Sequence, residues 1–369
     1  MTIPTLGTLS GRKLVTDLQS FGLQIGEQTG GIARKGGAGP SDHKTITIAG
    51  QTVMVPVYTS GAQHSPFQAS PPDQHGTSML LRDGRAVGTI YFPAAPRFYG
   101  LSTADGIPYW KIALLHGRDT LATTVHQTCI RYADRRTSCQ FCAIGQSLEA
   151  DRTIAYKTPA QLAEVAKAAV ELDGVRDMVL TTGTPNVVDR GAAVLAESAR
   201  AIKAAVDLPL QVQCEPPRDH GWFQRLREAG ADSLGMHLEA ATQAVREKIM
   251  PGKATVSVDR YMDAFASAVP IFGRGQVNTY ILAGLGDSPE DILALAERLI
   301  ALGVYPFVVP FVPISGTPLE NHVPPSAEFM KSVLAPLGRM LREANMKSTD
   351  IRAGCGRCGA CSSLSAYEQ

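Results

Sequence analysis

Thr124-Val-His-Gln-Thr-Cys129-Ile-Arg-Tyr-Ala-Asp-Arg-Arg-Thr-Ser-Cys139-Gln-Phe-Cys142-Ala-Ile-Gly145 places three cysteines at C-x9-C-x2-C spacing, directly after a run of β type. Three thiolates are soft ligands that suit an iron–sulfur cluster with one iron left open. A zinc knuckle is the alternative, but such a site normally uses four protein ligands. No fourth Cys or His stands at the corresponding spacing here.

Outward from this loop, the chain from residue 119 repeats strand, loop and helix six times, which predicts a parallel sheet with crossover helices. We expect strands near 120–128, 177–182, 208–215, 232–239, 276–284 and 305–313. Helices are expected near 158–172, 189–206, 219–229, 258–269, 289–302 and 326–344. A closed eight-unit barrel needs about 250 residues. Six units within residues 119–348 therefore predict an α/β fold, an open and partial (β/α)6 TIM-type barrel.

Two further segments flank this barrel. Residues 1–118 contain short β-type runs, with Asp83-Gly84 as a hairpin signal between two of them, and predict an antiparallel β-rich accessory domain. Its basic, glycine-rich segment from Gly30 to Gly39 matches no phosphate-binding motif and is interpreted as a plain loop. Residues 349–369 form a cysteine-containing tail.

Polar and apolar residues alternate along two of the predicted barrel strands. The apolar set must pack under the helices, so the other set should line the lumen. This set comprises Gln211, Gln213, Glu215, Ser233, His237 and Glu239. The same parity turns Cys214 toward the helices, where a lone Cys is usually a small core residue. A polar lumen indicates a bound ligand.

The composition is typical of a soluble globular protein of about two domains, with 44% hydrophobic and 19% charged residues. A net charge of +1 gives no electrostatic reason to expect nucleic acid or a membrane as a partner. The N-terminus lacks the pattern of a signal peptide, and six of the seven cysteines form two tight groups. We therefore expect a cytoplasmic protein that binds metal and acts on a small molecule.

The tail Cys355-Gly-Arg-Cys358-Gly-Ala-Cys361 has ferredoxin-like C-x2-C-x2-C spacing. It predicts a second iron–sulfur cluster, expected to be [4Fe-4S], whereas a zinc site again lacks an obvious fourth ligand. The eleven steps from Ala344 to Cys355 can span about 36 Å when extended. We therefore expect the tail to fold back over the mouth of the barrel, near the first cluster.

The first cysteine loop resembles the cluster loop of radical S-adenosylmethionine (radical SAM) enzymes, whose usual form is C-x3-C-x-aromatic-C. Phe141 is the aromatic residue, and the long first spacing is a departure that some branches of the superfamily share. The resemblance implies a [4Fe-4S] cluster on Cys129, Cys139 and Cys142, whose open iron is chelated by SAM.

The same resemblance assigns SAM contacts to segments at the carboxyl ends of the strands. Thr182-Gly183-Thr184 stands where the superfamily has a T-G-G-E-P-like segment, but the Glu is replaced, so only backbone recognition of SAM is expected. Gly284 and Gly286 resemble a G-x-G segment near adenine. Arg246 is a candidate for the SAM carboxylate. The alternatives are plain turns for the glycines and an exposed helix residue for Arg246.

Over most of its length the chain resembles the radical SAM family encoded beside nitrilases, which is related to biotin synthase and lipoyl synthase. The resemblance rests on the cluster loop, residues 103–117 and residues 353–361. It implies reductive cleavage of SAM to a 5′-deoxyadenosyl radical, which abstracts hydrogen from a small molecule. A flavodoxin- or ferredoxin-type reductase would supply the electron. The second cluster would bind substrate or donate sulfur. By analogy with lipoyl synthase, a tail serine such as Ser362, Ser363 or Ser365 would be one of its ligands. The alternatives are a non-catalytic iron–sulfur electron carrier and a zinc-stabilised binding module.

Overall fold

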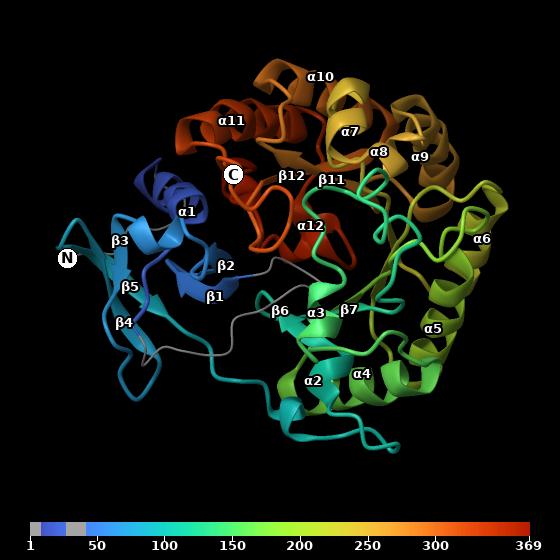
Figure 1. Cartoon of the computed structure of the whole chain (residues 1–369), viewed down its shortest axis with the longest axis horizontal. Coiled ribbons are helices and arrows are strands. Elements are labelled where there is room, and N and C mark those ends of the chain that lie inside the picture. The colour runs from blue at the N-terminus through green and yellow to red at the C-terminus, as the bar shows by residue number, and fades with distance from the viewer. Residues whose placement is uncertain (1–8, 27–41) are drawn as a thin grey trace.

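The structure is a computed structural model that describes residues 9–26 and 42–369. The basic loop predicted between Gly30 and Gly39 lies outside the described residues. Two sheets organise this part of the chain, a five-stranded antiparallel sheet and a seven-stranded sheet that curls into a partial barrel. Figure 1 shows the smaller sheet beside the barrel, and the helices of the barrel outside its strands.

The five-stranded sheet has the order β2-β1-β5-β4-β3. The helix α1 (Leu9–Phe21) contributes Val15 and Leu18 to its core. Asp83 and Gly84, both with positive φ, join β4 to β5 and confirm the predicted hairpin. The strands are β1 (His43–Ile48), β2 (Gln51–Pro56), β3 (Phe67–Ala69), β4 (Thr77–Arg82) and β5 (Arg85–Tyr91).

The seven-stranded sheet has the order β12-β11-β10-β9-β8-β7-β6, in which the first six strands are parallel and β6 (Leu114–His116) pairs antiparallel with β7. The six parallel strands confirm the predicted (β/α)6 partial barrel. Because β6 belongs to this sheet, the predicted domain boundary at residue 118 falls inside the barrel. The parallel strands are β7 (Thr120–Thr124), β8 (Asp177–Thr181), β9 (Leu210–Gln213), β10 (Ser233–Gly235), β11 (Val277–Ala283) and β12 (Val304–Pro310).

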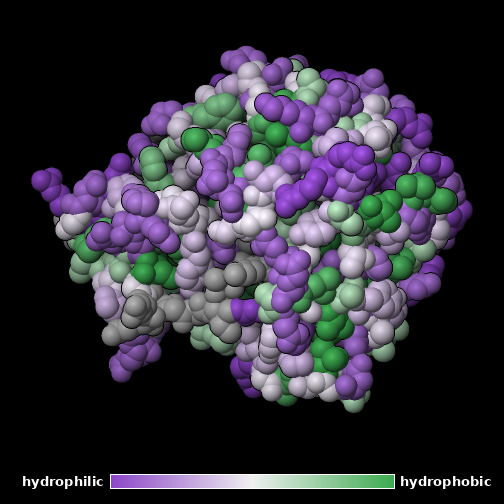
Figure 2. Space-filling model, in the orientation of Figure 1, coloured by the Kyte–Doolittle hydropathy of each residue, from purple (hydrophilic) through white to green (hydrophobic). Residues whose placement is uncertain are grey.

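Six helices connect or follow these strands, close to the predicted ranges. Capping boxes of Thr158 with Gln161 and of Ser288 with Asp291 fix the starts of two of them. Figure 2 shows hydrophilic residues over much of their outer surface, as expected of helices with one apolar face on a sheet. The helices are α4 (Pro159–Asp173), α5 (Ala192–Ala205), α6 (Gly221–Glu228), α9 (Val258–Phe272), α10 (Pro289–Leu302) and α11 (Ala327–Glu343).

Shorter helices lie around the barrel ends: α2 (Tyr109–Ile112), α3 (Gln146–Glu149), α7 (Gln243–Ile249), α8 (Pro251–Ala254), α12 (Cys355–Cys358) and α13 (Leu364–Tyr367). Residues 62–64, 97–100 and 348–350 form 3-10 turns. Within the described residues, no helix combines the length and apolarity needed to span a bilayer.

The parity predicted for the barrel strands agrees with the structure. Leu210, Val212 and Cys214 belong to the hydrophobic core under the helices. Gln211 and Gln213 alternate with them and are hydrogen-bonded to each other, 2.6 Å apart. The polar residues of β9 therefore face the inside of the barrel.

The position predicted for the tail is wrong, because it closes the amino-terminal end of the barrel instead of its mouth. Arg357 bonds to Asp119 and Asp177, which stand at the starts of β7 and β8. Gln276, directly before β11, donates to the carbonyl of Asp350 at 2.9 Å. Burial of apolar side chains stabilises the tail in this position, since four of them are at most 8% exposed: Ile351, Ala353, Leu364 and Tyr367. Figure 1 shows α12 inside the ring of strands.

The small sheet packs against this tail. The amide of Met54 in β2 donates to the carbonyl of Ala360 at 2.7 Å, and the side chain of Gln19 in α1 donates to the same carbonyl at 3.1 Å. The N-terminal unit therefore supports the tail from outside the barrel.

Lys157, just before α4, has a buried side chain at the end of β7. Its Nζ donates to the carbonyls of Thr124 at 2.7 Å and Ile154 at 3.4 Å, and burial lowers its pKa to about 7. The unfolded chain keeps the ordinary pKa of 10.5, so it binds more protons than the folded chain between these values. The contribution of Lys157 to stability should therefore rise with pH from about 7 to 10, by up to roughly 1.4 kcal/mol per pH unit.

Lys157→Met should remove this pH-dependent gain. We expect urea unfolding to show a stability difference between the wild type and Lys157→Met that grows as pH rises above 7, and no such growth for the control Lys167→Met, whose side chain is 56% exposed on α4. A Lys157→Met variant with the wild-type slope would refute the assignment.

Candidate active site

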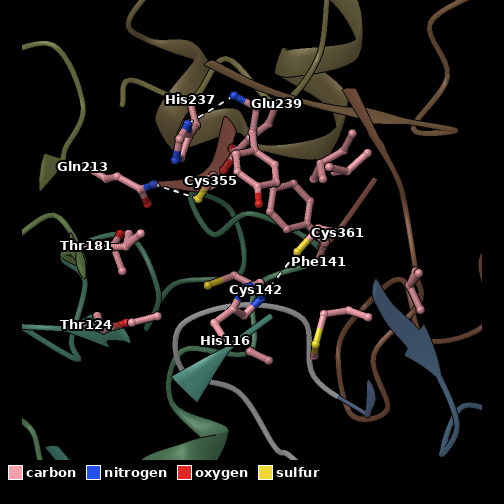
Figure 3. A pocket seen from close by; sticks show the side chains of 18 of the residues that line it. His116, Thr124, Phe141, Cys142, Thr181, Gln213, His237, Glu239, Cys355 and Cys361 are labelled. Carbon is pink, nitrogen blue, oxygen red and sulfur yellow. Dashed lines mark hydrogen bonds between the residues drawn. The ribbon is translucent and has the colours of Figure 1, made fainter. Parts of the chain in front are cut away.

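A cavity of about 400 Å³ lies inside the barrel, between the cysteine loop and the tail. Figure 3 shows side chains from both groups around this cavity, together with polar residues of the strands. The predicted site residues that line it are Phe141, Cys142, Thr182, Gly183, Gln213, His237, Glu239, Cys355, Cys358 and Cys361. The fold thus brings together cysteines of the loop and of the tail, which are more than two hundred residues apart in the sequence.

Close backbone contacts hold the cysteine loop at the carboxyl ends of the strands. A Cβ at Gly183 would lie 2.1 Å from the carbonyl oxygen of Thr128, so only glycine lets the segment after β8 approach the loop. The amide of Gly183 donates to His126, and the amide of Ile130 donates to the carbonyl of Thr184. The backbone of the Thr182-Gly183-Thr184 segment is therefore used in part to position the loop.

The thiols of this loop suit a cluster and do not suit free nucleophiles. Burial is the main cause that raises the pKa of Cys139, and it raises the pKa of Cys142 to about 12; the neighbouring thiols add to both effects. Such thiols ionise when they bind metal and release their protons in doing so. Among the described residues, no three His, Cys, Asp or Glu side chains converge on one ion. A cluster does not require that convergence, because each thiolate binds a different iron atom.

A buried ion pair lies next to the loop. Nζ of Lys253 is 2.9 Å from Oε2 of Glu239, and both side chains are less than 20% exposed. Burial opposes the charge of Lys253, but the carboxylate of Glu239 raises its pKa above the ordinary value. Glu239 has a φ of +67°, an uncommon conformation for a residue with a side chain. The electrostatic effect of this pair reaches Cys139, so a charged pair borders the three-thiol loop.

His237 presents a hydrogen-bond donor to the cavity. Its Nδ1 accepts a hydrogen bond from the amide of Tyr280 at 3.2 Å, so its proton resides on Nε2. Burial and the charge of Lys253 lower its pKa to about 3, which keeps the ring neutral. Nε2 is buried and has no hydrogen-bond partner among the described residues. A buried donor of this kind is suited to a ligand in the cavity.

The second thiol group faces the same cavity from the tail. Nε2 of the Gln213 side chain donates to Sγ of Cys355 at 3.1 Å, and the hydroxyl of Tyr280 hydrogen-bonds to Cys355 and Cys361. Both ring nitrogens of His116 contact thiols of the tail. Tyr280 was not selected by sequence reasoning, because it resembles an ordinary strand residue.

Glu215 does not line the cavity among the described residues. It bonds instead to Arg131 of the cysteine loop and lies 3.5 Å from Nη1 of Arg190, while Thr184 donates to it at 2.7 Å. These side chains tie the loop to the carboxyl ends of β8 and β9. Lys253 and Arg131 were missed because their partners are distant in sequence.

Arg246 has a structural role that corrects its assignment to the SAM carboxylate. It is fully buried and donates to the carbonyls of Leu238 and Val256, both at 2.7 Å. Its guanidinium also lies over the ring of Tyr261. A side chain that is fully buried and held by these partners is not accessible to SAM.

Gly284 and Gly286 fit the alternative reading as turn residues. Their φ angles are +104° and +131°, and a Cβ at Gly284 would lie 2.7 Å from the ring of Pro325. Neither residue lines the cavity in the described part of the chain. Turn geometry thus accounts for both glycines, and their contact with adenine stays a prediction.

Comparison with protein families identifies a domain that holds part of this site. Residues 134–299 match the model of the radical SAM superfamily, which confirms the predicted radical SAM domain. The match covers less than half of the chain. The narrower resemblance to the nitrilase-associated family stays a prediction.

Curated relatives cover only part of the chain. The bacteriochlorophyllide c C-7(1)-hydroxylase of Chlorobaculum limnaeum is 26% identical over 52% of this chain and 52% of its own length. The dual-specificity RNA methyltransferase RlmN of Solidesulfovibrio magneticus is 30% identical over 37% of this chain and 39% of its own length. The chain thus spans about half or less of the length of these relatives.

Solved structures give similar overlaps. A methylornithine synthase matches with a TM-score of 0.49 and 19% identity, over 67% of this chain and 69% of its own. A radical SAM methyltransferase from Sphaerobacter thermophilus matches with a TM-score of 0.48 and 17% identity, over 79% and 80%.

Proposed function

We propose that this chain is a radical SAM enzyme that modifies a small molecule inside its barrel. The observation that carries the proposal is the placement of the three-thiol loop, which overlaps the matched superfamily residues 134–299, beside a cavity that Cys142 lines together with polar side chains. Cys129, Cys139 and Cys142 would hold a [4Fe-4S] cluster. When bound, the cluster and SAM supply a 5′-deoxyadenosyl radical that abstracts hydrogen from the substrate.

The residues of the cavity have distinct roles in this proposal. Phe141 packs beside Phe311, with ring centroids 6.5 Å apart, and shields one side of the loop. His237 offers a neutral donor, and the Glu239–Lys253 pair offers fixed charges to polar groups of SAM or substrate. The apolar side chains in the cavity wall would also limit the access of water to a reactive radical.

We propose that Cys355, Cys358 and Cys361 hold a second iron–sulfur cluster in the same cavity. Their thiols line it, and burial is the main cause that raises the pKa of Cys355 and raises that of Cys358 to about 12. These are the same properties that suit the first loop to metal. The cluster would lie at the amino-terminal end of the barrel, facing the SAM site across the lumen.

A small substrate is favoured over RNA, although curated relatives include RNA methyltransferases. A net charge of +1 supplies no general attraction for a phosphate backbone, and the cavity is only about 400 Å³. A methyl-labelled SAM assay with total RNA separates the two substrates. Label transferred to RNA would favour the RNA alternative. We further propose a reducing, cytoplasmic setting with a flavodoxin- or ferredoxin-type donor, since all seven cysteines are free thiols.

A substitution of His237 tests the role of the cavity. His237→Asn keeps an acceptor for the amide of Tyr280 and removes the Nε2 donor. Loss of one hydrogen bond to a ligand should cost about 1–3 kcal/mol, or roughly 5- to 150-fold in kcat/KM for SAM cleavage. Because the pKa of His237 is about 3, titration of this residue should not change the wild-type rate near neutral pH.

The matched control for this substitution is His220→Asn, at the start of α6, where the ring contacts Ser267 instead of the cavity. Both variants should keep the iron content and melting temperature of the wild type. Equal kcat/KM values in His237→Asn and the wild type would contradict the role of His237.

Metal and sulfide analysis of anaerobically purified protein separates this function from its alternatives. A radical SAM enzyme should contain iron and sulfide, and SAM should change the EPR spectrum of its reduced cluster. An iron–sulfur electron carrier would show a cluster that does not respond to SAM. Zinc without sulfide would identify a zinc-stabilised module.

A further inference from the structure

We propose that His116 is the fourth protein ligand of the cluster held by Cys355, Cys358 and Cys361. The inference rests on the second cluster of the proposed function and adds the residue that completes its coordination. Figure 3 shows the ring of His116 directed toward Cys361.

The distances place His116 among the tail thiols. Its Nδ1 lies 3.4 Å from Sγ of Cys358, and its Nε2 lies 3.5 Å from Sγ of Cys361. The side chain lines the same cavity as all three thiols, and the residue is 7% exposed. The tail therefore has a nitrogen donor beside two of its three sulfur donors.

The backbone around His116 is shaped to admit a tail thiol. His116 ends β6, where it pairs with Thr120 of β7. Gly117 follows with a φ of +60°, and a Cβ there would lie 2.7 Å from Sγ of Cys358. Any larger residue would displace the thiol, so the β6–β7 turn and the tail fit together at this point.

The oxygen ligands suggested by analogy are occupied elsewhere. The hydroxyl of Ser362 donates to the carbonyl of Val308 at 2.6 Å, and that of Ser363 lies 2.9 Å from the hydroxyl of Thr16. Ser365 accepts from the side chain of Gln51 at 3.1 Å. None of the three serines lines the cavity among the described residues. The nitrogen donor His116 is better placed than any of them.

Histidine ligation has a consequence for the role of this cluster. Imidazole can replace thiolate at an iron–sulfur cluster and raises its reduction potential. Four protein ligands leave no vacant iron. The substrate would then bind to the side chains of the cavity, such as Gln213 and His237, instead of to the cluster.

The test detects nitrogen bound to the second cluster. Cys129→Ala/Cys139→Ala/Cys142→Ala leaves only the tail cluster, which is reconstituted anaerobically and reduced by irradiation of the frozen sample. Pulsed EPR should show a strong ¹⁴N coupling that becomes ¹⁵N after labelling with ¹⁵N-histidine. His116→Ala should abolish the coupling, and added imidazole should restore it. The same comparison in the two-cluster wild-type background does not depend on the folding of the triple variant.

His43→Ala is the control, because His43 lies in the wall of the same cavity on β1. It should leave the nitrogen coupling unchanged. A complete tail cluster without histidine coupling, or with coupling that persists in His116→Ala, would overturn this inference alone. Absence of iron from the tail would overturn the second cluster and the inference together.

Discussion

Cys139→Ala should abolish the reductive cleavage of SAM, with a fall in 5′-deoxyadenosine formation of roughly 10³-fold or more, about 4 kcal/mol in the barrier. Cys139 is the second of the three cysteines in the loop, and its thiol interacts electrostatically with Cys129, Cys142 and the Glu239–Lys253 pair. Loss of one of three thiolates leaves the cluster without a stable attachment. Dithionite-driven formation of 5′-deoxyadenosine, measured by chromatography, checks this result.

Cys214→Ala supplies the matched control. Cys214 is buried in the core under the helices and does not line the cavity in the described part of the chain. Its removal should leave a small cavity and a modest loss of stability, but full cluster content and SAM cleavage. Formation of 5′-deoxyadenosine by Cys139→Ala at the wild-type level would contradict the assignment of the loop to the cluster that cleaves SAM.

Cys355→Ala/Cys358→Ala/Cys361→Ala should remove one cluster while SAM cleavage continues. The iron and sulfide contents should fall by about half, since two clusters of similar type are proposed. The cysteine loop lies at the opposite end of the barrel from the tail, so its cluster should remain. Iron analysis and the yield of 5′-deoxyadenosine in the same sample test both statements.

Point substitutions are needed here because truncation would remove the cysteines and, at the same time, apolar residues that stabilise the fold. Removal of the residues after Asp350 would also remove Leu364 and Tyr367, which are buried against the barrel. Ser365→Ala, in the same tail, is a control that should retain both clusters. An unchanged iron content in the triple variant would exclude the second cluster.

The barrel was predictable because its signals are local. Apolar periodicity, the capping residues Thr158 and Ser288, and the alternation along β9 each depend on a few neighbouring residues. The position of the cysteine loop followed from its place after the first parallel strand. The same reasoning placed Gln213 and His237 toward the lumen.

The features that sequence reasoning missed depend on contacts between distant residues. Chain length showed how far the tail could reach, but the burial of Leu364 and the ion pairs of Arg357 determine where it lies. Arg246 looked available on a helix because its three carbonyl partners come from separate turns. His116 had no local motif and meets the tail thiols only in the folded chain.

The central claim is that the three-thiol loop supports reductive cleavage of SAM inside the barrel. The direct measurement is the formation of 5′-deoxyadenosine and methionine by anaerobically reconstituted wild-type protein with SAM and dithionite. We expect both products in equal amounts, and their formation to require the cluster. A protein that contains its full complement of iron and sulfide but forms neither product would contradict the claim.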